Sequence, residues 1–235
     1  MNLLGILSGT IIIGKSNLFQ NCRIEKLDTE FGRAVVFIAD NIILIPRHGN
    51  DPQNHILPHL INHRAHLRAF KNLGVTEVIG INSTGSLKRE LQPGMIVIPD
   101  DFLTLTAAPS IHKSSATHIS PSLNEGVRRK LIKAARNCNI PIVEKGIYWQ
   151  TTGPRLETKA EIKMMSNFAD IVGMTMASEA VIAQELDLPY ASVCSIDNFG
   201  NGLLEKPLNI EEIITGARKN TDLMIRILES CTKIF

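Results

Sequence analysis

Small polar residues that could hold an anion recur along the chain, each time directly after an apolar stretch. They occur as SGT (8–10), RHG (47–49), NSTGS (82–86), TTGPRLET (151–158), GMT (173–175) and DNFGNG (197–202). Gly, Ser and Thr offer backbone N–H groups and hydroxyls to an anion, and Arg47 adds a planar guanidinium. One such segment alone is usually an ordinary turn, but the agreement of all of them favours an oxyanion site.

The known templates for larger phosphate ligands are missing from the sequence. It contains no G-x-G-x-x-G after the first apolar stretch and no G-x-x-x-x-G-K-[ST]. It also lacks the G-x-S-x-G elbow of serine hydrolases and the H-E-x-x-H helix of zinc enzymes. The pattern therefore favours free phosphate over a dinucleotide, and it predicts no hydrolytic triad and no metal centre.

Apolar runs and amphipathic segments alternate through the chain, and these elements must position the polar segments. We expect strands at 3–7, in two parts of 33–48 with a hairpin turn at Asp40–Asn41, and at 77–81, 95–100, 146–150, 170–174 and 190–196. We expect helices at about 57–73, with Gly74 as C′ residue, and at 122–137, 158–168, 178–186 and 209–230. This alternation predicts a single α/β domain over residues 1–235, a three-layer sandwich with a mixed central sheet flanked by helices. Such sheets bind ligands at the carboxyl ends of their strands.

Composition excludes several other classes. The 235 residues are 44% hydrophobic and carry a formal charge of +2 without a basic stripe, so we expect no nucleic-acid partner. The N-terminus lacks a basic region and no apolar run is long enough for a membrane span, so we expect a cytoplasmic protein with no membrane partner. The four cysteines are far apart and are expected to be reduced.

Several longer motifs together resemble one family. They are GILSGT, PRHG, NSTGSLKRELQPGMIVIPDDF, GPRLETKAEI, VGMTMASEAVIAQELDLPYA and DNFGNG. Their types and order resemble the trimeric purine nucleoside phosphorylase and methylthioadenosine phosphorylase family over nearly the whole chain. The resemblance implies a homotrimer that uses a small-molecule nucleoside and inorganic phosphate, the latter as co-substrate, and no other cofactor.

The resemblance also implies roles for individual residues. The implied phosphate ligands are Thr10, Arg47, His48, the Ser83 N–H and Thr175. Met174 would lie against the sugar, Leu156 and Glu157 would face the purine, and Asn198 would bond N7 of the leaving base. No covalent nucleophile is required, because phosphate attacks the anomeric carbon and the site stabilises the separating charges.

The predicted base contacts indicate a 6-oxopurine. An ionised Glu157 accepts hydrogen bonds only, so it suits the N1–H of hypoxanthine or guanine and repels the N1 lone pair of adenine. In the adenine-using branch these positions are typically Ser in place of Glu157, Asp in place of Asn198 and a second Asp in place of Gly200. At all three positions this chain therefore differs from the branch that uses adenine nucleosides.

The sugar end resembles the methylthio branch instead. Where the inosine and guanosine branch has a His for the ribose 5′-hydroxyl, this chain has Ile210, which would pack against a methylthio group. His118, in a segment like the methylthio branch's loop, would reach a neighbouring subunit's pocket. We therefore predict a pentosyltransferase that phosphorolyses 5′-methylthioinosine in purine salvage.

Plainer interpretations stay open at this point. Glu157 could be an acid in the first turn of a helix, Asn198 a turn residue, Ile210 helix core and His118 a solvated loop residue. The histidines at 55, 59, 63 and 66 are expected to be exposed or capped rather than metal ligands. Rival functions are a general inosine/guanosine phosphorylase, a methylthioadenosine phosphorylase, a water-using nucleosidase and a non-catalytic nucleoside-binding protein.

Overall fold

The described strands join in one mixed sheet. The structure, a computed structural model, describes residues 2–9, 16–51, 53–106, 109–114, 117–205 and 209–235. The strands are β1 (Leu4–Ser8), β2 (Arg23–Thr29), β3 (Gly32–Ala39), β4 (Ile42–Pro46), β5 (Glu77–Ser86), β6 (Ile96–Val97), β7 (Asp101–Thr104), β8 (Ile142–Val143), β9 (Ile147–Gln150), β10 (Ile171–Gly173) and β11 (Tyr190–Phe199). Their order is β2-β3-β4-β1-β5-β10-β9-β7, and β11 pairs with β5 and β6 on a branch that continues to β8.

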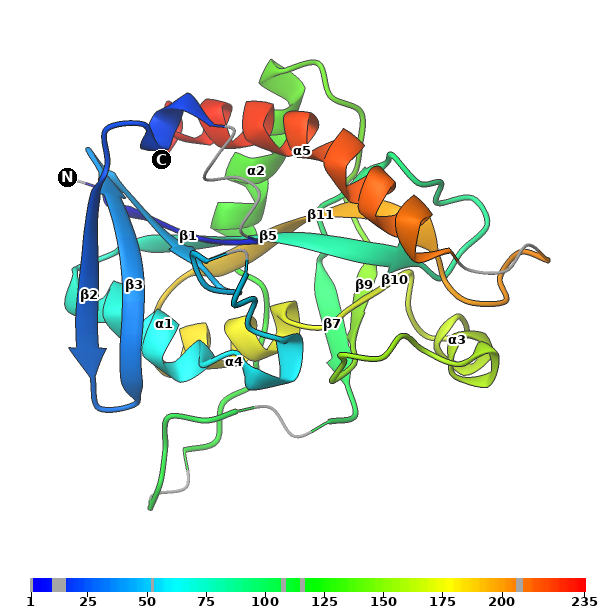
Figure 1. The fold of residues 1–235 in the computed structure, drawn as a ribbon, viewed down its shortest axis with the longest axis horizontal. Helices are drawn as coiled ribbons and strands as arrows, with labels where there is room; N and C mark the ends of the chain where they lie inside the picture. Colours follow the sequence, from blue (N-terminus) through cyan, green and yellow to red (C-terminus); the bar gives the residue numbers. More distant parts are fainter. Residues whose placement is uncertain (1, 10–15, 52, 107–108, 115–116, 206–208) are drawn as a thin grey trace.

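Helices cover both faces of this sheet. They are α1 (His63–Asn72), α2 (Glu125–Asn137), α3 (Lys159–Met165), α4 (Met176–Glu185) and α5 (Ile210–Cys231), with short 3-10 turns at Asn17–Phe19 and Pro58–Leu60. Figure 1 shows α2 and α5 on one side of the sheet and α1 and α4 on the other. One buried apolar cluster lies on each side, with Phe70 of α1 in one and Leu228 of α5 in the other. The predicted three-layer α/β sandwich with a mixed sheet is confirmed.

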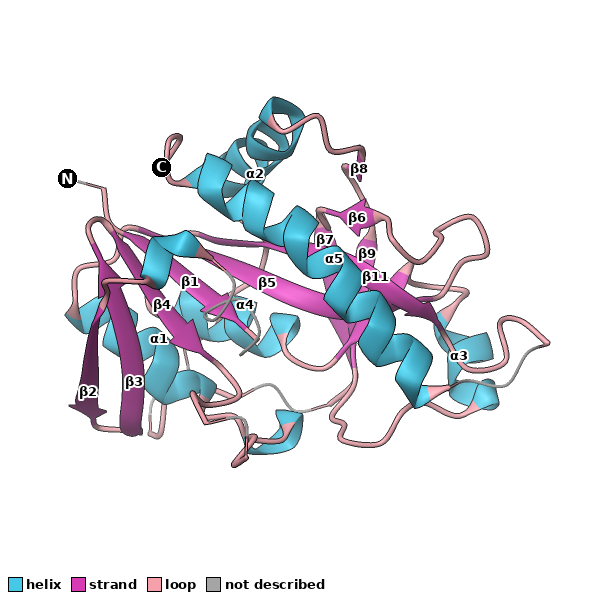
Figure 2. Ribbon diagram, turned by 45° about the horizontal axis from the view of Figure 1, so that its top comes forward, coloured by secondary structure: helices cyan, strands magenta, loops and turns pink. Residues whose placement is uncertain are grey.

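Strand β5 is the centre of the arrangement. Its first half pairs in parallel with β1, nearly its whole length pairs in parallel with β11, and its end pairs antiparallel with β10. In Figure 2, α5 crosses diagonally over β5 and β11. The carboxyl ends of β1, β4, β5 and β11 and the start of α4 are thereby brought to one region of the molecule.

Most predicted elements are present, and the differences have local causes. The helix expected over 57–73 begins only at His63, because Asn62 caps it by accepting from the Ala65 N–H at 3.1 Å. Gly74 follows it with φ of 76°, as expected of a C′ residue. Residues 23–29 form a strand that we did not predict. Its half-exposed pattern offers no continuous apolar run, and antiparallel pairing with β3 holds it in place.

Two segments predicted as loops after strands belong to the strands. Residues 82–86 complete β5, and residues 197–199 complete β11. Sheet pairing overrides the low strand propensity of these Asn, Ser and Gly residues. The strand expected over 77–81 is therefore too short, and the polar residues 82–86 form its carboxyl-terminal half.

The four cysteines, Cys22, Cys138, Cys194 and Cys231, are all free, and the last two are buried. Among the described residues, no helix is both long enough and apolar enough to cross a membrane. Within the same ranges, no group of three or more His, Cys, Asp or Glu side chains is arranged to hold a metal ion.

Candidate active site

A cavity of about 660 Å³ opens where these strand ends meet. Most of the predicted site residues line it: Arg47, His48, Ser83, Leu156, Glu157, Met174, Thr175, Asn198 and Gly200. His118 is exposed and does not line it. Thr10 lies outside the described residues, as does the side chain of Ile210, whose backbone begins α5.

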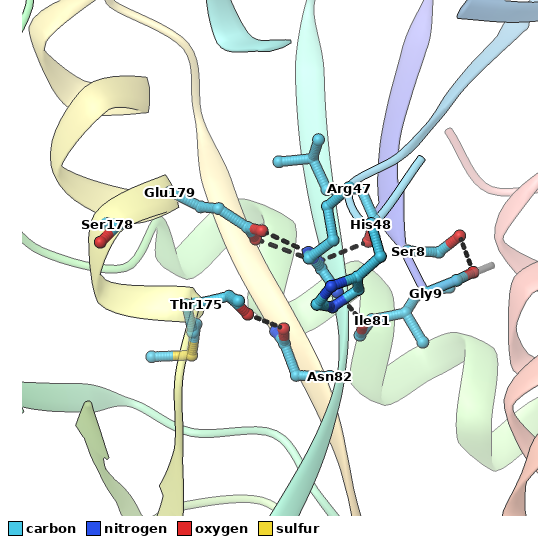
Figure 3. Close-up of polar contacts among 12 residues, drawn as sticks. Ser8, Gly9, Arg47, His48, Ile81, Asn82, Thr175, Ser178 and Glu179 are labelled. Atoms are coloured by element: carbon cyan, nitrogen blue, oxygen red, sulfur yellow. Dashed lines mark hydrogen bonds and ion pairs between the residues drawn. The ribbon is translucent and has the colours of Figure 1, made fainter. Parts of the chain in front are cut away.

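Arg47 is anchored in the floor of the cavity. Its Nε donates to Glu179 Oε1 at 2.6 Å and its Nη2 donates to Glu179 Oε2 at 3.2 Å (Figure 3). Nη1 donates to the Ile81 carbonyl at 2.7 Å and Nη2 to the Leu7 carbonyl at 2.8 Å. These bonds engage all but one of the five N–H groups of a guanidinium. Arg47 thus brings positive charge to the cavity but at most one further donor.

Glu179 was not among the predicted residues. It is completely buried in α4 and also accepts from the Tyr190 hydroxyl at 2.7 Å. Burial raises the pKa of Glu179, whereas the Arg47 charge and the hydrogen bonds from Arg47 and Tyr190 oppose that rise. The sequence offered little reason to expect this, because an acidic residue in a helix usually lies on the face exposed to solvent.

His48 is held as a neutral imidazole. Burial, followed by the adjacent Arg47 charge, lowers the pKa of His48 to about 4. Its Nδ1 lies 2.8 Å from the Ile56 carbonyl, and its ring stacks on His55 with centroids 4.5 Å apart. Because a carbonyl only accepts, Nδ1 carries the proton and Nε2 is left as an acceptor.

The histidines of α1 correct one expectation. His63 and His66 are buried rather than exposed or capped, while His55 and His59 are exposed as expected. Burial lowers the pKa of His66 to about 4 and that of His63 well below its usual value, and the Arg47 charge adds to both effects. These rings belong to the core beneath the Arg47 end of the cavity.

Thr175 lies at the start of α4, as the N-cap residue. Its Oγ1 donates to Asn82 Oδ1 at 2.9 Å (Figure 3). Asn82 Nδ2 donates in turn to the Ser192 hydroxyl at 2.6 Å. Met174 precedes Thr175 and packs against Gly153. A Cβ added to Gly153 would lie 2.5 Å from the Met174 sulfur.

The N–H groups of Thr175 and Met176 donate to the Tyr148 hydroxyl, and that of Ser178 donates to Gln150. The start of α4 therefore favours an anion next to Arg47 through its dipole more than through free donors.

Glu157 lies before α3 and not in its first turn. Thr158 is the N-cap residue, and Glu161 completes a capping box with it. Glu157 is 8% exposed, and its Oε1 accepts from the Thr151 hydroxyl at 2.6 Å. The interpretation of Glu157 as a first-turn acid is therefore wrong, and its carboxylate is available to the cavity.

The end of β11 contributes Asn198 and a residue that sequence reasoning missed, Asp197. Asn198 Nδ2 donates to the Phe199 carbonyl at 2.8 Å. Asp197 is 3% exposed and accepts hydrogen bonds from the Ser83 hydroxyl and from Asn220 Nδ2, the latter at 2.7 Å. Burial raises the pKa of Asp197, and the hydrogen bonds from Ser83, Asn220 and Ser195 oppose the rise.

Helix α5 supplies a mostly apolar stripe to the cavity, also missed. It consists of Ile213, Ala217, Thr221 and Met224. Spacings of four, four and three residues place these side chains on one helix face. This periodicity is visible in the sequence and could have identified them.

Comparisons with known proteins identify the family of this chain. The family model described as "Phosphorylase superfamily" matches residues 19–233. A probable 6-oxopurine nucleoside phosphorylase of Archaeoglobus fulgidus is 37% identical, covering 98% of this chain and 96% of that relative. A probable S-methyl-5′-thioinosine phosphorylase of Methanocaldococcus jannaschii is 33% identical, covering 97% and 90%.

A solved structure shares the fold closely. Methylthioadenosine phosphorylase from Schistosoma mansoni, in complex with adenine, superposes with a TM-score of 0.89 at 25% identity, covering 98% of this chain and 90% of that one. The cavity, its residues and these relatives lead to one conclusion. The chain belongs to the phosphorylase superfamily and is a nucleoside phosphorylase, an enzyme of the pentosyltransferase type.

Proposed function

We propose that this enzyme phosphorolyses a 6-oxopurine 5′-methylthionucleoside, converting 5′-methylthioinosine and phosphate to hypoxanthine and 5-methylthioribose 1-phosphate. The observation that carries the proposal is the buried Glu157 carboxyl group in the cavity wall. The relatives divide between 6-oxopurine, methylthioinosine and methylthioadenosine phosphorylases in their names, so the choice of substrate rests on the residues of this cavity.

Glu157 supports a base that carries a proton at N1. Thr151 donates to its Oε1, and the capping role that would otherwise occupy an acid here belongs to Glu161. The Glu157 carboxylate can therefore accept from N1–H of hypoxanthine, whereas adenine would present a lone pair to it. A mismatch of this kind, which leaves buried polar groups unpaired, discriminates by about 10⁴-fold where the site is built around the bond.

The apolar stripe supports a methylthio group. Ile213, Ala217 and Met224 line the same cavity as Pro58, so a 5′ substituent that lies against α5 meets carbon and sulfur more than polar atoms. Burying one methylthio group there would contribute about 1–2 kcal/mol. The sequence led us to expect this apolar contact from Ile210; the stripe on α5 now supports it instead.

The opposite end supports phosphate as the nucleophile. Arg47 with its remaining N–H, Thr175 at the start of α4, and the His48 ring, whose Nε2 can accept from a P–O–H group, all line the cavity. An anion in that place lies beside the sugar, where positive charge develops as the glycosidic bond breaks. We propose no cofactor besides this co-substrate.

A substrate panel with and without phosphate tests the proposal. We expect the order of kcat/KM to be methylthioinosine, then inosine, then methylthioadenosine, with formation of a sugar 1-phosphate only when phosphate is present. Inosine as the best substrate would instead support a general 6-oxopurine nucleoside phosphorylase, in line with the Archaeoglobus relative's name. Release of free base without phosphate would support a nucleosidase, and binding without turnover a nucleoside-binding protein.

We also propose a homotrimer in which His118 serves a neighbouring subunit's cavity. Its exposure and its absence from the cavity wall of its own chain support this role. Light scattering on the purified protein tests the trimer. The variant His118→Ala should raise KM for the nucleoside and leave KM for phosphate unchanged.

A further inference from the structure

A bulge in β11 places two consecutive polar side chains on the cavity wall. The pairing of β11 with β5 runs from Ile196 opposite Thr84 directly to Asn198 opposite Gly85, so Asp197 is an extra residue in the ladder. In a regular strand successive side chains point to opposite faces, whereas a bulge redirects one of them. Both Asp197 and Asn198 line the cavity.

The Asp197 carboxyl group is buried without a cation. Neutral donors hold both of its oxygens: the Ser83 hydroxyl at Oδ2 and Asn220 Nδ2 at Oδ1. Among the described residues, no Lys, Arg or His forms an ion pair with it. Burying a carboxylate in this way is costly, so the site favours its protonated form more than water does.

Its neighbour in the chain connects it with the leaving group. Asp197 directly precedes Asn198, the predicted partner of N7, and both line the cavity together with Glu157 and Gly200. Asn198 can donate or accept a hydrogen bond but cannot give up a proton. A carboxylic acid can transfer one, and N7 is the most basic nitrogen that a 6-oxopurine nucleoside offers.

Helix α5 fixes this carboxyl group. A Cβ on Gly216 would lie 2.2 Å from the Asp197 carbonyl oxygen, so only glycine lets the helix approach the bulge this closely. One turn later, Asn220 Nδ2 donates both to the Ile196 carbonyl at 2.9 Å and to Asp197 Oδ1. The bulge is therefore clamped, as positioning a proton donor requires.

We propose that Asp197 is the general acid of the reaction, with Asn198 as the hydrogen-bonding group beside it; this inference rests on the proposed function. As the bond from C1′ to N9 breaks, its electron pair passes to the purine and the Asp197 proton moves to N7. An oxygen of HPO₄²⁻ forms the new bond to C1′. The proton that this phosphate then loses returns through solvent to the Asp197 carboxylate, so protons and charge balance over one turnover.

The test compares two leaving groups in the isosteric variant Asp197→Asn. One substrate is the best purine nucleoside of the wild type, and the other is a 4-nitrophenyl β-riboside with the same 5′ group, whose phenolate leaves without a proton. We expect kcat to fall by about 10²–10³-fold on the nucleoside and by less than about tenfold on the nitrophenyl riboside. Similar losses on both substrates, or no loss on the nucleoside, would overturn the proposal.

A matched control separates chemistry from structure. Asn220→Ala removes a partner of Asp197 but no acid, so its losses on the two substrates should be similar. Thermal unfolding of Asp197→Asn checks that the variant folds, and we expect it to be at least as stable as the wild type because no buried charge is left uncompensated. If the wild type makes no sugar 1-phosphate, the proposed function fails; if it does and the variant is impaired equally on both substrates, only the role of Asp197 fails.

Discussion

Two buried carboxyl groups, one behind Arg47 and one on the cavity wall, are compensated differently. Glu179 faces the guanidinium of Arg47 and the hydroxyl of Tyr190. Asp197, on the cavity wall, has only neutral partners in the described part of the chain. The first arrangement fixes charge in place and stabilises a scaffold. The second keeps a carboxyl group close to giving up or taking a proton, which is the property that catalysis uses.

The ion pair also limits what Arg47 can do. Because most of its N–H groups are bonded to Glu179 and to main-chain carbonyls, it acts on a bound phosphate mainly through its charge. The direct hydrogen bonds to phosphate must come largely from other groups. The start of α4 contributes mainly its dipole, because the N–H groups of Thr175, Met176 and Ser178 already donate to Tyr148 and Gln150.

Breaking the ion pair between Arg47 and Glu179 should have the largest effect on stability. Glu179→Ala leaves the Arg47 charge buried and unpaired, which should lower the free energy of unfolding by about 3–5 kcal/mol. Urea unfolding measures the loss. The double variant Arg47→Met with Glu179→Leu should recover most of it, and a double variant as unstable as the single one would contradict the view of the pair as a scaffold.

Neutralising the base-facing carboxylate should change selectivity more than stability. Glu157→Gln replaces an acceptor by an amide, and we expect kcat/KM for the 6-oxopurine nucleoside to fall by about 10²-fold, near the upper end for a charged hydrogen bond. The adenine nucleoside should lose much less. Equal losses on both would remove Glu157 from base recognition, and the neighbouring capping variant Glu161→Gln serves as control because it should lower stability without changing the ratio.

Acid should destabilise the region around Arg47 through the buried histidines of α1. Burial lowers the pKa of His66 from an unfolded value of 6.5 to about 4, so the unfolded chain binds the proton first. The stabilisation is complete above pH 6.5 and is lost as pH falls toward 4, and the loss at pH 5 amounts to about 2 kcal/mol for this residue. Urea midpoints measured between pH 7.5 and 5 should show the decline, and His66→Gln should flatten it. An unchanged slope would place the pH dependence elsewhere.

Pushing α5 away from the bulge should have the smallest effect on stability. In Gly216→Ala the new methyl group meets the Asp197 carbonyl, and relief of the overlap should cost about 1–3 kcal/mol. Differential scanning calorimetry measures the cost. The matched change Thr215→Ala, one residue away at an exposed position, should be nearly neutral. If the two variants unfold alike, the contact between α5 and β11 is not tight.

The sequence predicts the fold well because its apolar pattern is regular. The apolar run before Gly9 and the periodic segment after Asn209 become β1 and α5 with shifts of a residue or so. The resemblance to the phosphorylase family pointed to Glu157 and Asn198, whereas their residue types alone left a helix-start acid and a turn residue open. These residues do line the cavity.

Asp197 could not be found in the same way. With regular alternation, a strand that directs Asn198 into the cavity directs Asp197 away from it, and only the bulge brings both together. Glu179 was hidden for a related reason, because its cation is 132 residues away in sequence. Long-range pairing of this kind leaves no local pattern.

The pair of acids at the start of α3 has a further consequence. Glu161 caps α3 and Glu157 does not, so a substitution at residue 157 leaves the helix cap in place and loses only the bond from Thr151. Under the proposed role of Glu157, a single mutation there would change nucleobase preference at a small cost in stability.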